Sequence, residues 1–245
     1  MEGPRAVAEA LGSHAAVREL FVVADAPGAP GLCSAARAAG VPVTSVSPRV
    51  MQALAGTTTP QGVVAVVQAP AARLQELVAG ASLVVVLADV RDPGNAGTLL
   101  RSAAAAGADA IVFCSGAVDA LHPKTVRSAA GSLWRLPVVR DVSLPDCAAE
   151  LRAAGLVVVG ADASAPRQLY DADLTRRLGL VLGNESWGIS GEAGALLDEA
   201  VSVPVQPGVD SLNVAVAGSV ILFEAARQRR AGGGPRRVVY PRRHE

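Results

Sequence analysis

Residues 202–224 read S-V-P-V-Q-P-G-V-D-S-L-N-V-A-V-A-G-S-V-I-L-F-E, and this stretch indicates more about the fold than any other. Its second half, from Leu212 to Phe223, is apolar enough to form a buried helix. Two polar residues, Ser211 and Asn213, stand where this helix begins, shortly after a Pro-Gly turn. The first N–H groups of a helix have no partner within the helix, so such a start is suited to hold a polar ligand.

Short apolar segments alternate with helical patterns along the rest of the chain. This alternation predicts an α/β fold with a parallel sheet and right-handed crossovers. The composition agrees, because 51% of the 245 residues are hydrophobic and only 3% are aromatic, so the core must be mostly Ala, Val and Leu. We expect strands at 20–24, 41–46, 63–68, 83–88, 110–114, 136–140, 156–160, 178–183 and 200–203, and helices at 5–17, 32–39, 48–55, 95–106, 122–130, 144–154, 192–198 and 212–229.

The pattern restarts in the middle of the chain, which predicts two units. A small α/β unit occupies residues 1–70, and a segment at 71–81, partly helical, links it to the larger unit at 82–230. Residues 231–245 form a basic tail that we expect to be disordered.

A first polar motif, D-P-G-N-A-G-T-L-L-R-S-A, occupies residues 92–103. Its Asp-Pro-Gly start predicts a turn, and Asn95 is a candidate N-cap for the helix that follows. Arg101 lies six residues later, about 120° around the helix from Asn95. Taken alone, the motif fits a capped helix with one exposed arginine, and the dinucleotide fingerprint G-x-G-x-x-G is absent.

A second motif, L-G-N-E-S-W-G, occupies residues 182–188, and the third is the stretch quoted first. Gly183 ends an apolar strand, so that main chain can approach a ligand there, and Glu185 follows in a glycine-rich loop. Capping accounts for Ser211, whereas Asn213 falls inside the expected helix, where Asn is unfavourable. All three motifs follow the carboxyl ends of expected strands, which is where ligands bind in parallel sheets.

These three motifs, in this order over about 130 residues, resemble the SpoU/TrmH class of the SPOUT superfamily, whose members are RNA 2'-O-ribose methyltransferases. The resemblance covers residues 82–230, and the unit before it resembles the L30e-like RNA-binding domain of this class. It implies a deep trefoil knot in the C-terminal part of the chain, a homodimer with the active site near the subunit interface, and S-adenosyl-L-methionine as methyl donor.

Carried over to this chain, the resemblance implies two sets of site residues. The catalytic set lies at the target ribose and comprises Asn95, Arg101, Glu185, Ser211 and Asn213. The cofactor set comprises Gly183, Val203 and Leu212. No metal is expected, because the three Cys and three His residues form no cluster at ligand spacing.

The substrate implied is a structured RNA, and a recognition unit of about 70 residues favours 23S ribosomal RNA over tRNA. The formal net charge is zero, so any phosphate contact depends on local groups, among them the arginines of the C-terminal tail. No membrane span or cleavable signal is visible, and we expect a cytoplasmic protein. Three alternatives stay open: a tRNA 2'-O-methyltransferase, a non-catalytic RNA-binding protein with this fold, and a nucleotide-binding enzyme with another cofactor.

Overall fold

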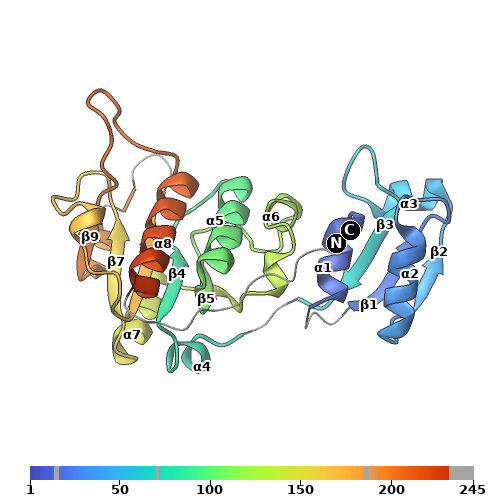
Figure 1. The fold of residues 1–245 in the computed structure, drawn as a ribbon, viewed down its shortest axis with the longest axis horizontal. Helices are drawn as coiled ribbons and strands as arrows, with labels where there is room; N and C mark the ends of the chain where they lie inside the picture. Colours follow the sequence, from blue (N-terminus) through green and yellow to red (C-terminus); the bar gives the residue numbers. More distant parts are fainter. Residues whose placement is uncertain (14–16, 70–71, 185–187, 190, 232–245) are drawn as a thin grey trace.

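The computed structural model describes residues 1–13, 17–69, 72–184, 188–189 and 191–231. It contains two sheets, one in an N-terminal unit (residues 1–69) and one in a C-terminal unit (residues 72–231) (Figure 1). The predicted α/β class is confirmed. No helix in the described part of the chain is both long and apolar enough to cross a bilayer.

The N-terminal unit has a three-stranded sheet of order β2-β1-β3, in which β1 pairs parallel with β2 and antiparallel with β3. Helices and sheet enclose one small core that includes Val7, Leu20 and Val63. The elements are α1 (Pro4–Leu11), β1 (Val17–Val22), α2 (Ala29–Ala38), β2 (Val43–Ser45), α3 (Pro48–Leu54) and β3 (Val63–Val67).

The helix expected over residues 5–17 is wrong in its second half. Helix α1 ends at Leu11, where Gly12 is the C-cap, and Val17 already belongs to β1. Val17 therefore pairs with Val67 of β3 in the sheet instead of continuing a helical face, a case in which tertiary pairing overrides local periodicity.

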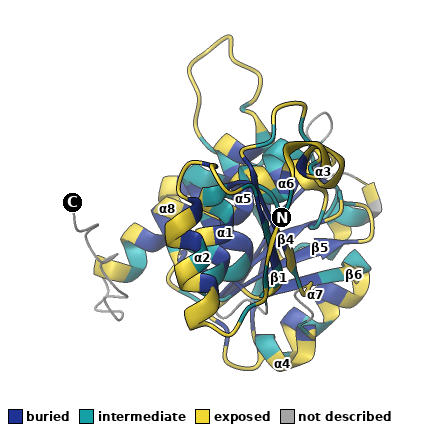
Figure 2. Cartoon of the chain, turned by 90° about the vertical axis from the view of Figure 1, so that its right-hand side faces the viewer, coloured by how far each residue is buried: buried dark blue, intermediate teal, exposed yellow. Residues whose placement is uncertain are grey.

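The C-terminal unit has a six-stranded sheet of order β6-β5-β4-β8-β7-β9 in which every pairing is parallel. Strands β4, β5 and β8 are buried along their whole length, as expected for a sheet covered on both faces. Figure 2 shows these strands as the most buried part of the unit. The strands are β4 (Leu83–Leu87), β5 (Ala110–Cys114), β6 (Val138–Val142), β7 (Val157–Ala161), β8 (Leu178–Leu182) and β9 (Glu199–Val201).

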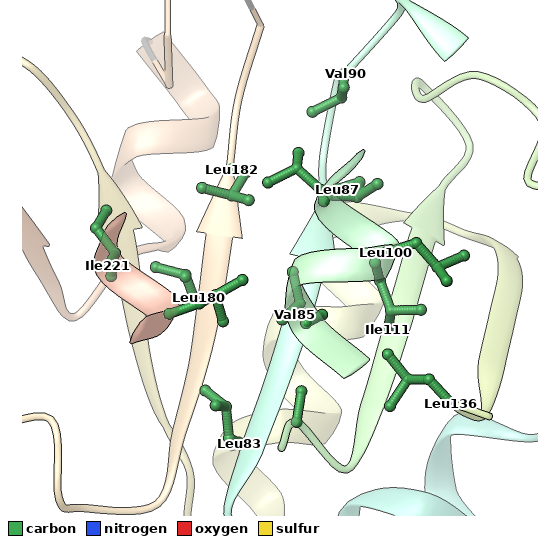
Figure 3. Close-up of a cluster of buried hydrophobic side chains, with 14 of the residues drawn as sticks. Leu83, Val85, Leu87, Val90, Leu100, Ile111, Leu136, Leu180, Leu182 and Ile221 are labelled. Carbon is green, nitrogen blue, oxygen red and sulfur yellow. The ribbon is translucent and has the colours of Figure 1, made fainter. Parts of the chain in front are cut away.

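Alternate residues of each central strand face two different helix layers. Leu83, Val85 and Leu87 pack with helices α5 and α8, as the cluster in Figure 3 shows for Leu100 and Ile221. The intervening Val84 and Val86 pack with α4 and α7. The helices are α4 (Leu74–Val78), α5 (Pro93–Ala106), α6 (Pro123–Ser128), α7 (Leu144–Ala153) and α8 (Val214–Ala231), with 3-10 turns η1 (Ser132–Trp134), η2 (Leu169–Asp171) and η3 (Gly191–Leu196).

The segment 71–81, expected as a linker, contains α4 in its described part. Leu74 and Val78 of this helix are only 3% exposed and belong to the core between the sheet and α7. The second half of the segment is thereby anchored to the C-terminal unit. The chain between the two sheets is shorter than the sequence suggested.

Small residues bring α5 and α8 close together. A Cβ atom on Gly218 would lie 2.5 Å from Leu99 Cδ2 and 2.8 Å from Leu182, so no larger residue fits there without displacement. One turn along, the hydroxyls of Ser102 and Ser219 are 2.7 Å apart. This packing places the start of α8 beside the start of α5, which unites the first and third motifs.

Candidate active site

A pocket of ≈ 290 Å³ lies beyond the carboxyl ends of β7, β8 and β9, against the start of α8. Its location is the one predicted from the parallel strand pattern. Apolar side chains form its walls and polar groups stand at its edge, as in small-molecule sites generally. Its lining comprises Ala161, Asp162, Ala163, Ser164, Leu182, Gly183, Asn184, Gly188, Val201, Val203, Val205, Asp210, Ser211, Leu212, Val214, Ala217 and Ile221.

All three residues expected to bind the cofactor, Gly183, Val203 and Leu212, line this pocket. Gly183 leaves no room for a side chain, because a Cβ atom there would lie 2.2 Å from the carbonyl oxygen of Gly188. That carbonyl accepts from the N–H of Asn184 at 2.9 Å, and the Gly188 N–H donates back to the Asn184 carbonyl at 2.9 Å. Asn184 and Gly188 are thus paired with each other directly beside Gly183.

Asn184 ties the second motif to the segment that follows β4, three residues before the first motif. Its side chain is 6% exposed, and Nδ2 donates to Asp89 Oδ2 at 3.0 Å. Asp89 follows β4 and Asn184 follows β8, and these two strands are neighbours in the sheet. The sequence reasoning did not single out Asn184, although it sits inside the motif between Gly183 and Glu185.

The pocket also contains polar groups that belong to none of the three sequence motifs. Asp162 follows β7, and its Oδ1 accepts from the main-chain N–H and the hydroxyl of Ser164, both at 2.8 Å. Asp210 belongs to the exposed loop before α8. A carboxylate directly after a buried strand, as in V-V-V-G-A-D at 157–162, was the available signal for Asp162.

Asn95 and Asn213 meet across the α5–α8 contact. Asn213 Nδ2 donates to Asn95 Oδ1 at 3.1 Å, while Asn213 Oδ1 accepts from the N–H groups of Ala215 at 2.9 Å and Val216 at 3.3 Å. Main-chain N–H groups can only donate, so the atom that faces them is the amide oxygen and the other must be the NH₂ group. Asn213 therefore caps α8 and holds Asn95 with one side chain.

The predicted capping roles are wrong in two places. Helix α5 is capped by Asp92, whose Oδ1 accepts from the Asn95 N–H at 2.8 Å, rather than by Asn95 itself. Helix α8 begins at Val214 and not at Leu212, so that Asn213 is its cap and Ser211 lies in the preceding loop, exposed at the pocket. Pro93 in the first turn accounts for the earlier start of α5, since Pro is favoured there.

Asp92 is stabilised as a carboxylate. The hydrogen bond from the Asn95 N–H, assisted by Lys124 with Nζ at 3.0 Å from Oδ2, holds the pKa of Asp92 below its usual value. The negative charge at the start of α5 also compensates the positive end of the helix dipole.

The remaining catalytic candidates are not found in the described part of the pocket lining. Arg101 is exposed on α5. Arg101, Asn95 and Asn213 are not among the described residues that line the pocket. Glu185 lies outside the described residues. The structure therefore brings together one group inside the pocket (Gly183, Val203, Ser211 and Leu212) and one beside it (Asn95 and Asn213).

Fold and site together define an α/β protein with a small-molecule pocket at the ends of parallel strands and a paired amide cluster beside it. A family model described as the SpoU rRNA methylase family matches residues 82–223. A second model, described as RNA 2'-O ribose methyltransferase substrate binding, matches residues 1–72. The chain belongs to the SpoU rRNA methylase family.

Named relatives are similar in sequence over most of this chain. It is 36% identical over 239 residues to the 23S rRNA (guanosine-2'-O-)-methyltransferase RlmB of Xanthomonas axonopodis pv. citri, covering 93% of this chain and 95% of that one. It is 41% identical to a 23S rRNA (uridine(2479)-2'-O)-methyltransferase of Streptomyces viridochromogenes, covering 71% of this chain and 62% of the relative.

Solved structures agree as well. The SpoU methyltransferase AviRb from Streptomyces viridochromogenes, in complex with the cofactor AdoMet, superposes with a TM-score of 0.82 at 34% identity, covering 95% of this chain and 90% of that one. An AdoMet-bound rRNA methyltransferase from Sinorhizobium meliloti gives a TM-score of 0.81 at 30% identity, covering 93% and 86%. The resemblance inferred from the three motifs is thus confirmed.

Proposed function

We propose that this protein transfers a methyl group from S-adenosyl-L-methionine to a ribose 2'-hydroxyl of 23S ribosomal RNA. The observation that carries the proposal is the bond between Asn213 and Asn95, which joins the third motif to the first beside the pocket lined by Gly183, Val203 and Leu212. Relatives over nearly the whole chain are named as 23S rRNA 2'-O-methyltransferases, and AdoMet-bound structures share the fold.

The pocket residues suit this cofactor. Val203, Leu212 and Ile221 offer apolar walls for an adenine ring. The main chain after Ser202 lies beyond the strand pairing, where its polar groups can contact the edge of the ring. Asp162, Ser164 and Asp210 offer acceptors for ribose hydroxyls and for an ammonium group. When bound, S-adenosyl-L-methionine supplies a methyl group on a sulfonium, which is an excellent leaving group.

The work left to the protein is alignment and removal of the hydroxyl proton. Holding donor and acceptor in line supplies most of the rate in such a transfer. We assign Asn95 and Asn213 to hold the ribose, and Ser211 to the junction between ribose and cofactor. Arg101 binds RNA phosphate and stabilises developing negative charge, because a guanidinium stays protonated in proteins and is not a general base. Glu185, or a water, takes the proton.

Variants of Arg101 and Glu185 separate these roles in single-turnover assays. Arg101→Ala should lower the rate steeply while Arg101→Lys stays near normal, because the role depends on charge. Equal rates for Glu185→Gln and the unaltered protein at all pH values would remove Glu185 from proton transfer.

We further propose a cytoplasmic homodimer with a trefoil-knotted C-terminal unit and an L30e-like N-terminal unit that binds RNA. The exposed side chains of Val216 and Phe223, each 49% exposed and seven residues apart, give α8 an apolar outer face that a second copy can cover. Sedimentation of Phe223→Asp tests the dimer: the variant should be monomeric, and an unaltered mass would move the interface elsewhere.

The experiment that tests the function is transfer of tritiated methyl groups from S-adenosyl-L-methionine to total bacterial RNA. Label in 23S rRNA supports the proposal, and label in tRNA supports the tRNA alternative. The absence of label, despite bound cofactor in calorimetry, would favour the non-catalytic RNA-binding protein. Calorimetric titration with NAD and ATP distinguishes the third alternative, an enzyme with another cofactor.

A further inference from the structure

An ion pair joins the two units of the chain. Arg135, directly after η1 in the C-terminal unit, donates from Nε to Glu9 Oε2 at 3.0 Å and also from Nη2 to the same oxygen. Glu9 lies on α1, the helix of the N-terminal unit that faces α6 in Figure 1. The pair is only partly exposed, at 44% for Arg135 and 26% for Glu9.

The aliphatic part of the Glu9 side chain packs against a turn at Ala130 and Gly131, whose backbone conformation is unusual. Ala130 has φ 48° and Gly131 has φ 86°, so two consecutive residues are left-handed. A Cβ atom on Gly131 would lie 2.6 Å from Glu9 Cβ, which only glycine avoids. A left-handed alanine is unfavourable and persists where surrounding contacts require it. Here the left-handed conformation of Ala130 is required by the packing of α1 against this turn.

This turn is one short helix away from the candidate active site. It follows α6, whose Lys124 pairs with Asp92 at 3.0 Å and whose Ser128 hydroxyl donates to the Pro93 carbonyl at 3.2 Å. Both contacts lie at the start of α5, where Asn95 is found. Through these contacts, α6 links the position of α1 to that of α5, the helix that carries the first motif.

We propose that Glu9, Gly131 and Arg135 form a docking contact that holds the N-terminal unit in one orientation against the C-terminal unit. RNA bound by the first unit is then presented to Asn95 and Arg101 at a fixed distance. These are positioning residues, and they touch neither cofactor nor ribose. The consequence for RNA rests on the proposed function, whereas the contact itself does not.

A contact of this size suffices because the units are tethered. The core cluster of the N-terminal unit is separate from the two clusters of the C-terminal unit, so no shared core fixes the orientation. An exposed ion pair between free molecules contributes little. Between units on a short linker, the effective concentration is in the millimolar range, and a modest contact decides whether the docked state dominates. Loss of the pair should lower the docked population by about three- to tenfold.

Charge reversal with solution scattering tests the contact without any assay of activity. Glu9→Arg and Arg135→Glu should each increase the radius of gyration, and the double variant should restore it, because the pair is re-formed with exchanged charges. Arg152→Glu is the matched control, since Arg152 pairs with Asp198 at 2.8 Å entirely within the C-terminal unit. Unaltered scattering in both single variants would overturn the docking contact.

Kinetics test the consequence for RNA. In the single variants the KM for rRNA should rise about three- to tenfold with kcat unchanged, and the double variant should recover. The affinity for S-adenosyl-L-methionine should stay the same, which also shows that the C-terminal unit is folded. An unaltered KM in scattering-altered variants would overturn the positioning role. Absence of methyl transfer by the unaltered protein would instead overturn the proposed function, while the scattering result would still decide the contact.

Discussion

Asn213 performs two tasks with one side chain, capping α8 through Oδ1 and holding Asn95 through Nδ2. Serine and aspartate cap helices about as well as asparagine. Neither can replace the amide as a donor to Asn95, because the serine side chain is too short and an ionised aspartate only accepts hydrogen bonds. The two tasks are therefore separable by substitution.

Asn213→Asp should keep the melting temperature near that of the unaltered protein and reduce the single-turnover rate strongly, because two acceptor oxygens would then face each other. Asn213→Ala should lose the rate and also about 1 kcal/mol of stability with the cap. The measurements are thermal unfolding and single-turnover methyl transfer. A fully active Asn213→Asp would show that the bond to Asn95 has no part in catalysis.

Gly183 offers a second test at the scale of one residue. Gly183→Ala places Cβ against the Gly188 carbonyl and should disrupt the pairing of Asn184 with Gly188 at the pocket, lowering the affinity for S-adenosyl-L-methionine at least tenfold in calorimetry. Gly80→Ala is the control, because a Cβ atom there meets nothing within 4 Å. Equal affinities for the two variants would contradict the role of Gly183.

Among elements, α8 is the one on which the site depends most, and its far end is firmly held. Gln228 accepts from the Leu174 N–H at 2.8 Å and donates to the Ala172 carbonyl at 3.0 Å. Arg229 donates to the Leu174 carbonyl at 2.9 Å. Glu224 accepts from Gln228 at 2.9 Å and from Arg227, so the loop between β7 and β8 is tied to the last turns of the helix.

This network predicts a dependence of stability on pH. Hydrogen bonds from Arg227 and Gln228 lower the pKa of Glu224 to about 2. Because the folded-state pKa lies below that of the unfolded chain, the contribution is complete above the ordinary pKa of a glutamate and is lost as the pH falls toward 2. Melting temperatures measured from pH 5 to pH 2 should fall less steeply for Glu224→Gln than for the unaltered protein. Parallel curves would contradict the assignment.

The elements show how far local sequence determines this fold. The strand at Ala110–Cys114 and the helix end at residue 106 were predicted and are confirmed. Buried parallel strands have a strong local signature, and so do glycine C-caps such as the left-handed Gly107. Both caps at the site were assigned one position or more away from their true residues. Asp92 and Asn95 are both good caps, and only the hydrogen bond to a particular N–H distinguishes them.

At the scale of the whole molecule, three distant motifs form one site because two pairs of elements are neighbours. Strand β4 pairs with β8, and helix α5 packs against α8. Asn184 donates to Asp89 across the β4–β8 pair, and Asn213 donates to Asn95 across the α5–α8 contact. Strand order is set by long-range pairing, so the sequence alone predicted the edge of the sheet where the ligand binds but not these bonds. Asp162 was missed for the same reason, since β7 carries no motif.

The ion pair between Glu9 and Arg135 extends this arrangement to the N-terminal unit. A family model described as RNA 2'-O ribose methyltransferase substrate binding matches that unit, and the SpoU model matches the other. The relatives named above modify guanosine in one case and uridine in another.

The most direct test of the account is the chemical identity of the methylated product. After incubation of unmodified 23S rRNA with the protein and labelled S-adenosyl-L-methionine, complete nuclease digestion and mass spectrometry should give a single 2'-O-methylated nucleoside. The label should be lost in the Asn213→Asp variant. Label on a base, label spread over many nucleosides, or none in rRNA would contradict the assignment of this site to ribose methylation.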